Sequence, residues 1–207
     1  MKLLKKLKNL IIPEENDFFG DLTELSKTTE DIIKSLIIKY TSDQKTDIQD
    51  LIKEAKQSKK DKLKLLEKTF ITPVDREAIS RSYAHLYWVT LSVDHLIKEL
   101  DVYDIKNLSE YKNVFKLLEE QLTKLTLAYS LFNQKKYGEI IKIVNAIIHL
   151  DNELVLAYSK HLNIIFEQDK KLSHILRHKE ILNQLKEISK RIHLSANQIE
   201  DIVFKID

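Results

Sequence analysis

Asp151 is the side chain whose type and position could most readily do chemistry in this sequence. It stands between Ile147 and Leu154 in a helical spacing of otherwise apolar residues, and such spacing predicts a position that faces the interior of a bundle. An isolated buried carboxylate is unfavourable, so Asp151 needs either a metal ion or a basic neighbour. Because buried charges are usually paired, we expect a salt bridge to a lysine of a neighbouring helix, or a face turned towards water, rather than a metal ligand.

Two histidines, His174 and His178, lie one helical turn apart and could share a metal ion. The sequence places no third ligand near them, and the run "KKLSHILRHKE" is typical of a solvated basic face. The chain also lacks a P-loop, a dinucleotide-binding fingerprint, a nucleophile elbow and the HExxH motif. We therefore predict no enzyme activity, no catalytic residue, no metal ligand and no cofactor.

Basic residues form two further patterns. Near the C-terminus, polar residues step by four, three, four and three along one stripe, made of Lys186, Lys190, His193, Asn197 and Glu200. We interpret this stripe as a solvent face; the alternative is a groove that accepts an anion or an acidic partner helix. Between residues 53 and 68, seven lysines accompany only three acids, Glu54, Asp61 and Glu67. This run is also more typical of a solvated face than of a docking patch.

The composition excludes several classes of protein. Two Gly and two Pro in 207 residues leave little material for hairpin turns or glycine-rich phosphate loops. The absence of Cys removes disulfides, cysteine zinc sites and thiol catalysis. A net charge of +2 argues against a dedicated nucleic-acid-binding protein. No apolar run approaches the ~18 residues of a membrane-spanning helix, so we predict no transmembrane segment.

The first residues of the chain, "MKLLKKLKNLII", carry lysines throughout. They lack the compact apolar stretch and the cleavage site of a signal peptide. The segment is either a basic amphipathic helix that lies on a membrane surface or a frayed or docked terminal helix. We expect the terminal helix.

Hydrophobic spacing divides the chain into about six helices. Apolar residues recur at steps of three and four, as in the series Ile79, Tyr83 and Leu86. The predicted helices cover roughly residues 17–40, 44–69, 72–100, 111–132, 140–165 and 181–202. Their connections are short, which favours antiparallel neighbours. We predict an all-α, elongated antiparallel bundle of about six long helices, with residues 1–207 forming a single domain.

The third helix has a strong start signal in "TPVD". Thr72 is suited to cap the helix, and Pro73 fits the first helical position because its missing N–H has no partner there. Asp75 completes a capping box three residues after Thr72. The proline therefore predicts a helix start rather than a break.

With these residues in view, the chain resembles the PhoU-like proteins, in the branch described as phosphate-transport regulators or Pit accessory proteins. The most specific run is "TFITPVDREAI" at residues 69–79. Supporting similarity lies in "PEENDFF" at residues 13–19, "HKEI" at 178–181 and "SANQIEDIVFKI" at 195–206. The resemblance covers nearly the whole chain and implies a PhoU-like helical bundle with a role in phosphate uptake or its regulation.

The resemblance also implies carboxylate clusters, typically Glu-x-x-x-Asp, which bind metal ions in many members. In a register counted from Phe70, the corresponding positions hold mostly apolar or basic residues: Ile52, Lys56, Tyr87, Trp88, Leu91, Ile147, Asp151, Lys186 and Lys190. Apolar and lysine side chains do not ligate hard cations, so we expect a packed core in place of a metal site. A register shift of one turn would instead bring Glu54, Asp94 or Glu187 into play.

These features predict a non-enzymatic regulatory or accessory protein of inorganic phosphate transport, which acts by protein–protein contact and has largely lost the metal ligands. The implied partner is a phosphate transporter or a signalling protein at the cytoplasmic face of the membrane. The protein itself is then cytoplasmic or peripheral to the inner membrane. The alternative is a metal-binding PhoU-type bundle with a residual carboxylate site near Asp151. A scaffold that forms homodimers is a third option, and we expect no nucleic-acid partner.

Overall fold

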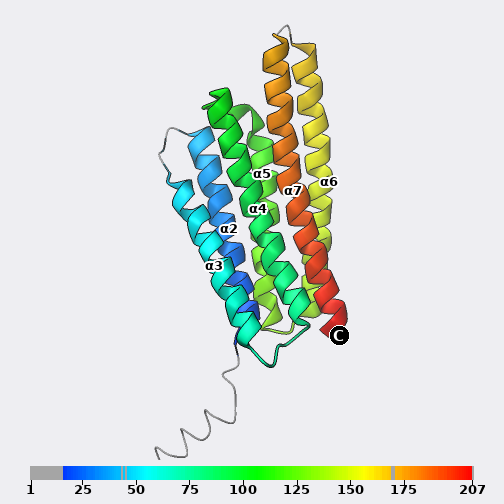
Figure 1. The fold of residues 1–207 in the computed structure, drawn as a ribbon. Helices are drawn as coiled ribbons and strands as arrows, with labels where there is room; N and C mark the ends of the chain where they lie inside the picture. Colours follow the sequence, from blue (N-terminus) through cyan, green and yellow to red (C-terminus); the bar gives the residue numbers. More distant parts are fainter. Residues whose placement is uncertain (1–15, 43, 45, 169–170, 207) are drawn as a thin grey trace, which may run out of the picture.

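The computed structural model describes residues 16–42, 44, 46–168 and 171–206 of the chain. Its α-helices are α2 (Phe18–Thr41), α3 (Ile48–Lys68), α4 (Arg76–Tyr103), α5 (Lys112–Phe132), α6 (Tyr137–Glu167) and α7 (Leu172–Ile206), with a short 3₁₀ helix at Ser109–Tyr111 (Figure 1). The described residues contain no strand. The predicted all-α bundle of long helices is therefore confirmed. The terminal helix expected for residues 1–12 lies outside the described residues.

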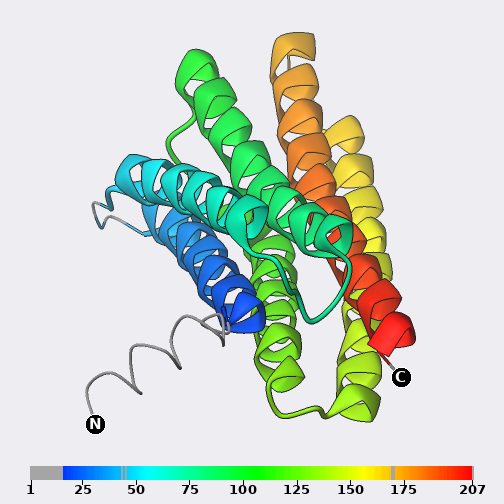
Figure 2. The same cartoon turned by 60° about the horizontal axis from the view of Figure 1, so that its bottom comes forward.

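The helices are arranged as a central group with a cover on each side. Helices α2, α4, α5 and α7 pack against one another, with α2 and α7 each contacting both α4 and α5. Helix α3 covers α2 and α4 on one side of this group, and α6 covers α5 and α7 on the other (Figures 1 and 2). The hairpin of α6 and α7 extends past the other helices at one end (Figure 1). Helices α3 and α6 therefore each keep one face available for contact.

One continuous cluster of buried apolar side chains draws on all six α-helices. Ile79, Tyr83 and Leu86, which define the predicted seam of the third helix, are fully buried. Burial of such a side chain contributes about 1.5–3 kcal/mol. Helix α3 contributes least, with only Ile48, Ile52, Ala55 and Leu66 buried. Its lysine-rich middle therefore lies largely at the surface.

The start of α4 differs from the prediction. The helix begins at Arg76 with Asp75 as its N-cap residue, so the predicted cap at Thr72 and the predicted first helical position at Pro73 are wrong, and Pro73 lies in the loop before the helix. The Thr72 hydroxyl instead donates to the backbone oxygen of Val74 at 2.7 Å, within the loop. Asp75 makes no side-chain capping bond, because its carboxylate accepts a hydrogen bond from Lys205 Nζ at 2.8 Å. This ion pair joins the start of α4 to the end of α7.

Helix α7 also begins earlier than predicted. It starts at Leu172, and the residues up to Ile181 extend it by several turns. His174 and His178 are consequently helical and lie in the part of α7 that pairs with α6 in the protruding hairpin (Figure 1). Among the described helices, none has an apolar stretch long enough to cross a membrane.

Candidate functional site

The loop that joins α3 to α4 contains the run "TFITPVD" and is held by hydrogen bonds from two side chains, Arg76 and Asn16. Arg76 Nη2 donates to the backbone oxygen of Thr69 and, at 3.2 Å, to that of Phe70. Asn16 Nδ2 donates to Thr69 Oγ1 at 2.8 Å and so ties the loop to the segment before α2. The two Arg76 bonds satisfy backbone oxygens that would otherwise need water. The loop backbone is therefore fixed by its own neighbours.

The same loop leaves two large apolar side chains in solvent. Phe70 is 86% exposed and Ile71 is 68% exposed. An adjacent cavity of about 410 Å³ is lined by Ile71, Thr72 and Pro73 from the loop and by residues at the start of α2 and the end of α5. Exposed apolar residues on a fixed loop, beside a hollow, are typical of a contact surface. We call Phe70 and Ile71 the apolar pair of the loop.

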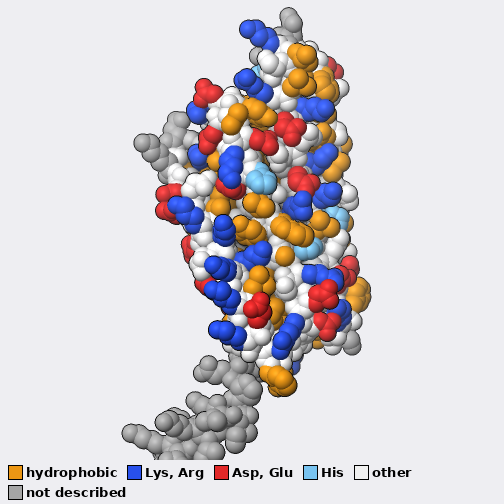
Figure 3. All heavy atoms as spheres, in the orientation of Figure 1, with side chains coloured by type: hydrophobic (Ala, Val, Ile, Leu, Met, Phe, Trp, Pro, Cys, Tyr) orange, Lys and Arg blue, Asp and Glu red, His pale blue; other side chains and the backbone are white. Residues whose placement is uncertain are grey.

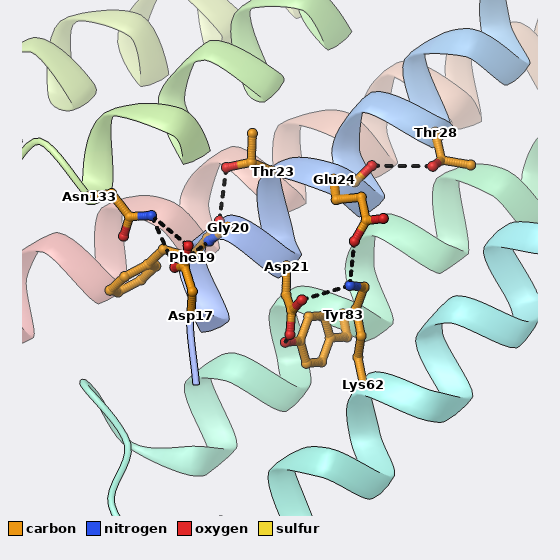
Figure 4. Close-up of polar contacts among 10 residues, drawn as sticks. All are labelled: Asp17, Phe19, Gly20, Asp21, Thr23, Glu24, Thr28, Lys62, Tyr83 and Asn133. Carbon is orange, nitrogen blue, oxygen red and sulfur yellow. Dashed lines mark hydrogen bonds and ion pairs between the residues drawn. The ribbon is translucent and has the colours of Figure 1, made fainter. Parts of the chain in front are cut away.

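The start of α2 supports this cavity through a capping network (Figure 4). Asp17 is the N-cap residue, and its Oδ1 accepts a hydrogen bond from the backbone N–H of Gly20 at 2.8 Å. Asn133 Nδ2, at the end of α5, donates to both carboxylate oxygens of Asp17. A Cβ atom at position 20 would lie 2.2 Å from Asp17 Oδ2, so glycine leaves the room that this cap needs.

Lys62 joins α3 to α2 beside the cap (Figure 4). Its Nζ donates to Asp21 Oδ1 at 2.8 Å and to Glu24 Oε2 at 2.7 Å. Burial opposes the charge on Lys62, but the hydrogen bonds to the two carboxylates outweigh burial and raise the lysine pKa. The Tyr83 hydroxyl of α4 also donates to Asp21, at 3.4 Å. One ammonium group thus links α3 to the central helices.

Asp151 has a different partner from the lysine that the sequence led us to expect. His193 Nδ1 lies 2.8 Å from Asp151 Oδ2, and the Ser189 hydroxyl donates to Asp151 Oδ1 at 2.6 Å. Gln121 Nε2 on α5 donates to Ser189 Oγ at 2.9 Å. Three helices, α5, α6 and α7, therefore share one polar network. Because Asp151 stands between the serine and the histidine, the arrangement does not place the histidine as a base for the serine.

The other residues of the predicted C-terminal stripe do not gather into a site. Lys186 Nζ lies 4.1 Å from the centre of the Tyr158 ring, and Lys190 is exposed. Of the stripe, only His193 reaches the Asp151 network. Only Lys190 of the stripe is exposed, and Lys186, His193, Asn197 and Glu200 are half-buried, so the interpretation as a solvent face holds for Lys190 alone.

The two predicted histidines lie beside Tyr111 and Glu110. The rings of His174 and His178 have centroids 4.1 Å apart. His178 Nδ1 lies 2.7 Å from the Tyr111 hydroxyl and 3.1 Å from Glu110 Oε1, and this histidine contact lowers the pKa of Glu110. Within the described ranges, no group of three or more His, Asp or Glu side chains is arranged to hold a metal ion.

The aromatic residues that occupy the expected carboxylate register are not core residues. Trp88 is 40% exposed and Tyr87 is half-buried, so the expectation of a packed core at these two positions is wrong. The reason is that α4 turns its Ile79, Tyr83 and Leu86 face inwards, which leaves positions 87 and 88 at the surface. At the surface each ring contacts a basic side chain. Lys59 Nζ lies 4.6 Å from the centre of the Tyr87 ring, and the guanidinium carbon of Arg191 lies 5.5 Å from the centre of the Trp88 ring.

Beside Tyr87, α3 and α4 enclose a groove of about 520 Å³ that we call the lysine groove. Its lining consists of Lys53, Lys56, Gln57, Lys59, Lys60, Leu63, Lys64, Glu67 and Tyr87. Figure 3 shows basic side chains along the part of this face that α3 occupies. The lysine run, interpreted from sequence as a plain solvated face, is hollowed here.

Sequence reasoning singled out Asp151 and the lysine run, but it did not identify the residues with which Asp151 and Lys62 pair. Ser189 and Gln121 are fully buried polar residues, and their placement on apolar helix faces is the signal that could have paired them with Asp151. The contact of Lys62 with Asp21 joins residues far apart in the chain. Nothing in the local pattern of α3 distinguishes Lys62 from its neighbours in this way.

Comparison with known proteins finds a distant similarity over nearly the whole chain. No protein-family model matches the chain. The chain is similar to UPF0111 protein YkaA of Bacillus subtilis (strain 168), with 23% identity over 192 residues that cover 89% of this chain and 93% of that protein. The name of that protein states no activity or substrate. The similarity extends over nearly the full length of both chains, and the function has to be argued from the surfaces described above.

Proposed function

We propose that the protein is a non-enzymatic accessory protein of inorganic phosphate transport that acts by contact with a membrane transporter or a signalling protein. The observation that carries this proposal is the apolar pair, Phe70 and Ile71, exposed on a loop whose backbone oxygens accept hydrogen bonds from Arg76. This loop lies in the run "TFITPVDREAI" that most resembles PhoU-like phosphate-transport regulators. The partner chemistry that fits it is an apolar surface of another protein.

A protein that works by contact needs no catalytic group, and the polar networks described above are consistent with structural roles. The Asp151 network is closed among its own members, with the carboxylate bonded to Ser189 and His193. Lys62 likewise stabilises the packing of α3. Elemental analysis of the purified protein tests the metal-free part of the proposal, which two or more bound iron, zinc or nickel ions per chain would contradict.

Deletion of the gene, followed by complementation, tests the role in transport. Phosphate uptake and cellular polyphosphate content are measured under phosphate starvation and excess. We expect deletion to change both quantities, and the wild-type gene to restore them. Unchanged values in both conditions would remove the proposed function.

A pair of matched double variants then tests the loop. Replacement of both Phe70 and Ile71 by Ser removes the apolar pair, and replacement of both Ile164 and Phe166 by Ser removes the same two residue types from the exposed surface of α6. We expect the loop variant to behave like the deletion and the α6 variant to behave like the wild type. The reverse result would move the contact surface to the hairpin of α6 and α7.

A further inference from the structure

The lysine groove holds an excess of positive charge, because five lysines line it and Glu67 is the one carboxylate among its lining residues. Lys53 pairs with Asp50 at 2.8 Å, and Lys62 turns away towards α2. Among the described residues, no carboxylate lies within ion-pair distance of Lys56, Lys59, Lys60 or Lys64. Four ammonium groups on one helix face repel one another. An anion in the groove would relieve this repulsion.

The length of the groove indicates the size of the anion. From Lys56 to Lys64, the helix rises about 12 Å. A single phosphate group carries at most about two charges near neutral pH and cannot reach lysines spread over that length. A chain of linked phosphates places closely spaced negative charges along the whole row. Lysine suits such a ligand because its ammonium group is a compact charge on a flexible stem, with no fixed planar geometry to satisfy.

The lining of the groove also argues against two other kinds of partner, an acidic helix and a lipid surface. An amphipathic acidic helix would need exposed apolar side chains to cover, but Leu63 packs against the core and the Tyr87 ring already carries Lys59 Nζ. A lipid surface is flat over this distance, whereas these lysines line a hollow of about 520 Å³ between two helices. Both partners fit the groove less well than a flexible, purely anionic chain.

We propose that the lysine groove between α3 and α4 binds a linear chain of linked phosphates, of the inorganic polyphosphate class. The choice of a phosphate anion rests on the proposed function, and it names the signal that an accessory protein of phosphate transport would sense. Lys56, Lys59, Lys60 and Lys64 contact the phosphate oxygens, and Tyr87 holds Lys59 at the wall of the groove.

Titration calorimetry with sodium tripolyphosphate and with a longer polyphosphate chain tests the proposal. The groove variant changes Lys56, Lys59, Lys60 and Lys64 to Gln. The control variant removes the same charge elsewhere by changing Lys27, Lys116, Lys142 and Lys179, which are all exposed, to Gln. We expect roughly tenfold or greater loss of affinity in the groove variant, a weaker dependence on salt, and wild-type affinity in the control. If the fourfold change impairs folding, the double variant Lys56→Gln with Lys60→Gln replaces it. We expect this double variant to lose an intermediate part of the affinity.

Further titrations compare polyphosphate with other anions at equal charge. Polyglutamate, a single-stranded oligonucleotide and vesicles that contain anionic phospholipid should each bind more weakly than polyphosphate. Equal loss of affinity in groove and control variants would overturn the proposal, as would tighter binding of any of these three. Since these measurements use purified protein, absence of polyphosphate binding leaves the gene-deletion test of the transport role intact, and the two failures are distinguishable.

Discussion

Helix α3 has lysines on two faces, and they differ in whether the rest of the molecule supplies carboxylates to pair with them. On one face, Lys62 is 11% exposed in its side chain and donates to Asp21 and Glu24. On the other, Lys56, Lys60 and Lys64 lie in solvent, with no carboxylate of the described residues in range. The residue type is the same and only the angular position differs. The comparison teaches that a lysine-rich helix can use one lysine to hold the fold and the remainder to present charge.

The largest expected effect on this comparison comes from Lys62→Met. Removal of the ammonium group leaves Asp21 beside the Tyr83 hydroxyl without its strongest partner. Hydrogen bonds to charged groups contribute about 1.5–3 kcal/mol, so we expect a loss of about 2 kcal/mol in the free energy of unfolding. Urea denaturation at neutral pH measures it. The control is Lys64→Met, two residues further along the same helix on its exposed face. It should change stability by less than about 0.5 kcal/mol.

Glu30→Gln extends the comparison of paired and unpaired charges to Glu30, an acid that pairs with Lys34 inside the bundle. Burial opposes ionisation of Glu30, but hydrogen bonds from Lys34 at 2.7 Å and Thr123 at 2.9 Å outweigh burial and lower its pKa. The ionised group therefore stabilises the fold above its ordinary pKa, and this contribution is lost as the pH falls through the lowered value. Urea denaturation between about pH 6 and pH 3 should show a shallower acid loss of stability in Glu30→Gln. An unchanged slope would show that Glu30 contributes nothing at acid pH.

The smallest expected effect concerns Trp88, whose ring contacts Arg191 of α7 on a different side of α4 from the groove. Burial lowers the pKa of His85, and its ring centroid lies 5.1 Å from that of Trp88, the single tryptophan of the chain. The neutral histidine is thus favoured in the fold, and stability falls slightly as acid forces protonation. We expect Trp88 fluorescence to titrate below the ordinary histidine range, and His85→Gln to abolish that step. Persistence of the step in His85→Gln would assign it to another group.

The sequence was sufficient to predict the helices because the heptad seams are long and regular. Ile79, Tyr83 and Leu86 occupy the core as their spacing predicts. The start of α4 was misplaced because the Thr72 hydroxyl bonds to the backbone of Val74 within the loop, and the Asp75 side chain pairs with Lys205, which only the fold brings within 2.8 Å. Local signals locate helices well, but they do not show which long-range partner competes for a capping side chain.

The candidate surfaces were only partly predictable for the same reason. The run that contains Phe70 and Ile71 was singled out in the sequence, but the exposure of these two side chains follows from how Arg76 and Asn16 hold the loop. Trp88 was expected in the core, because a register counted along the chain does not fix which way α4 faces. The pairing of Asp151 with His193 again requires α6 and α7 to be in place.

The central claim is that the two faces of α3 have separable roles, one structural and one for binding. The most direct test measures the free energy of unfolding of Lys62→Met and of the fourfold Lys→Gln groove variant, each with and without sodium tripolyphosphate. The account predicts that Lys62→Met is destabilised but is still stabilised by tripolyphosphate, whereas the groove variant keeps wild-type stability and loses the response to tripolyphosphate. A loss of stability and of response together in both variants, or a full response in the groove variant, would contradict it.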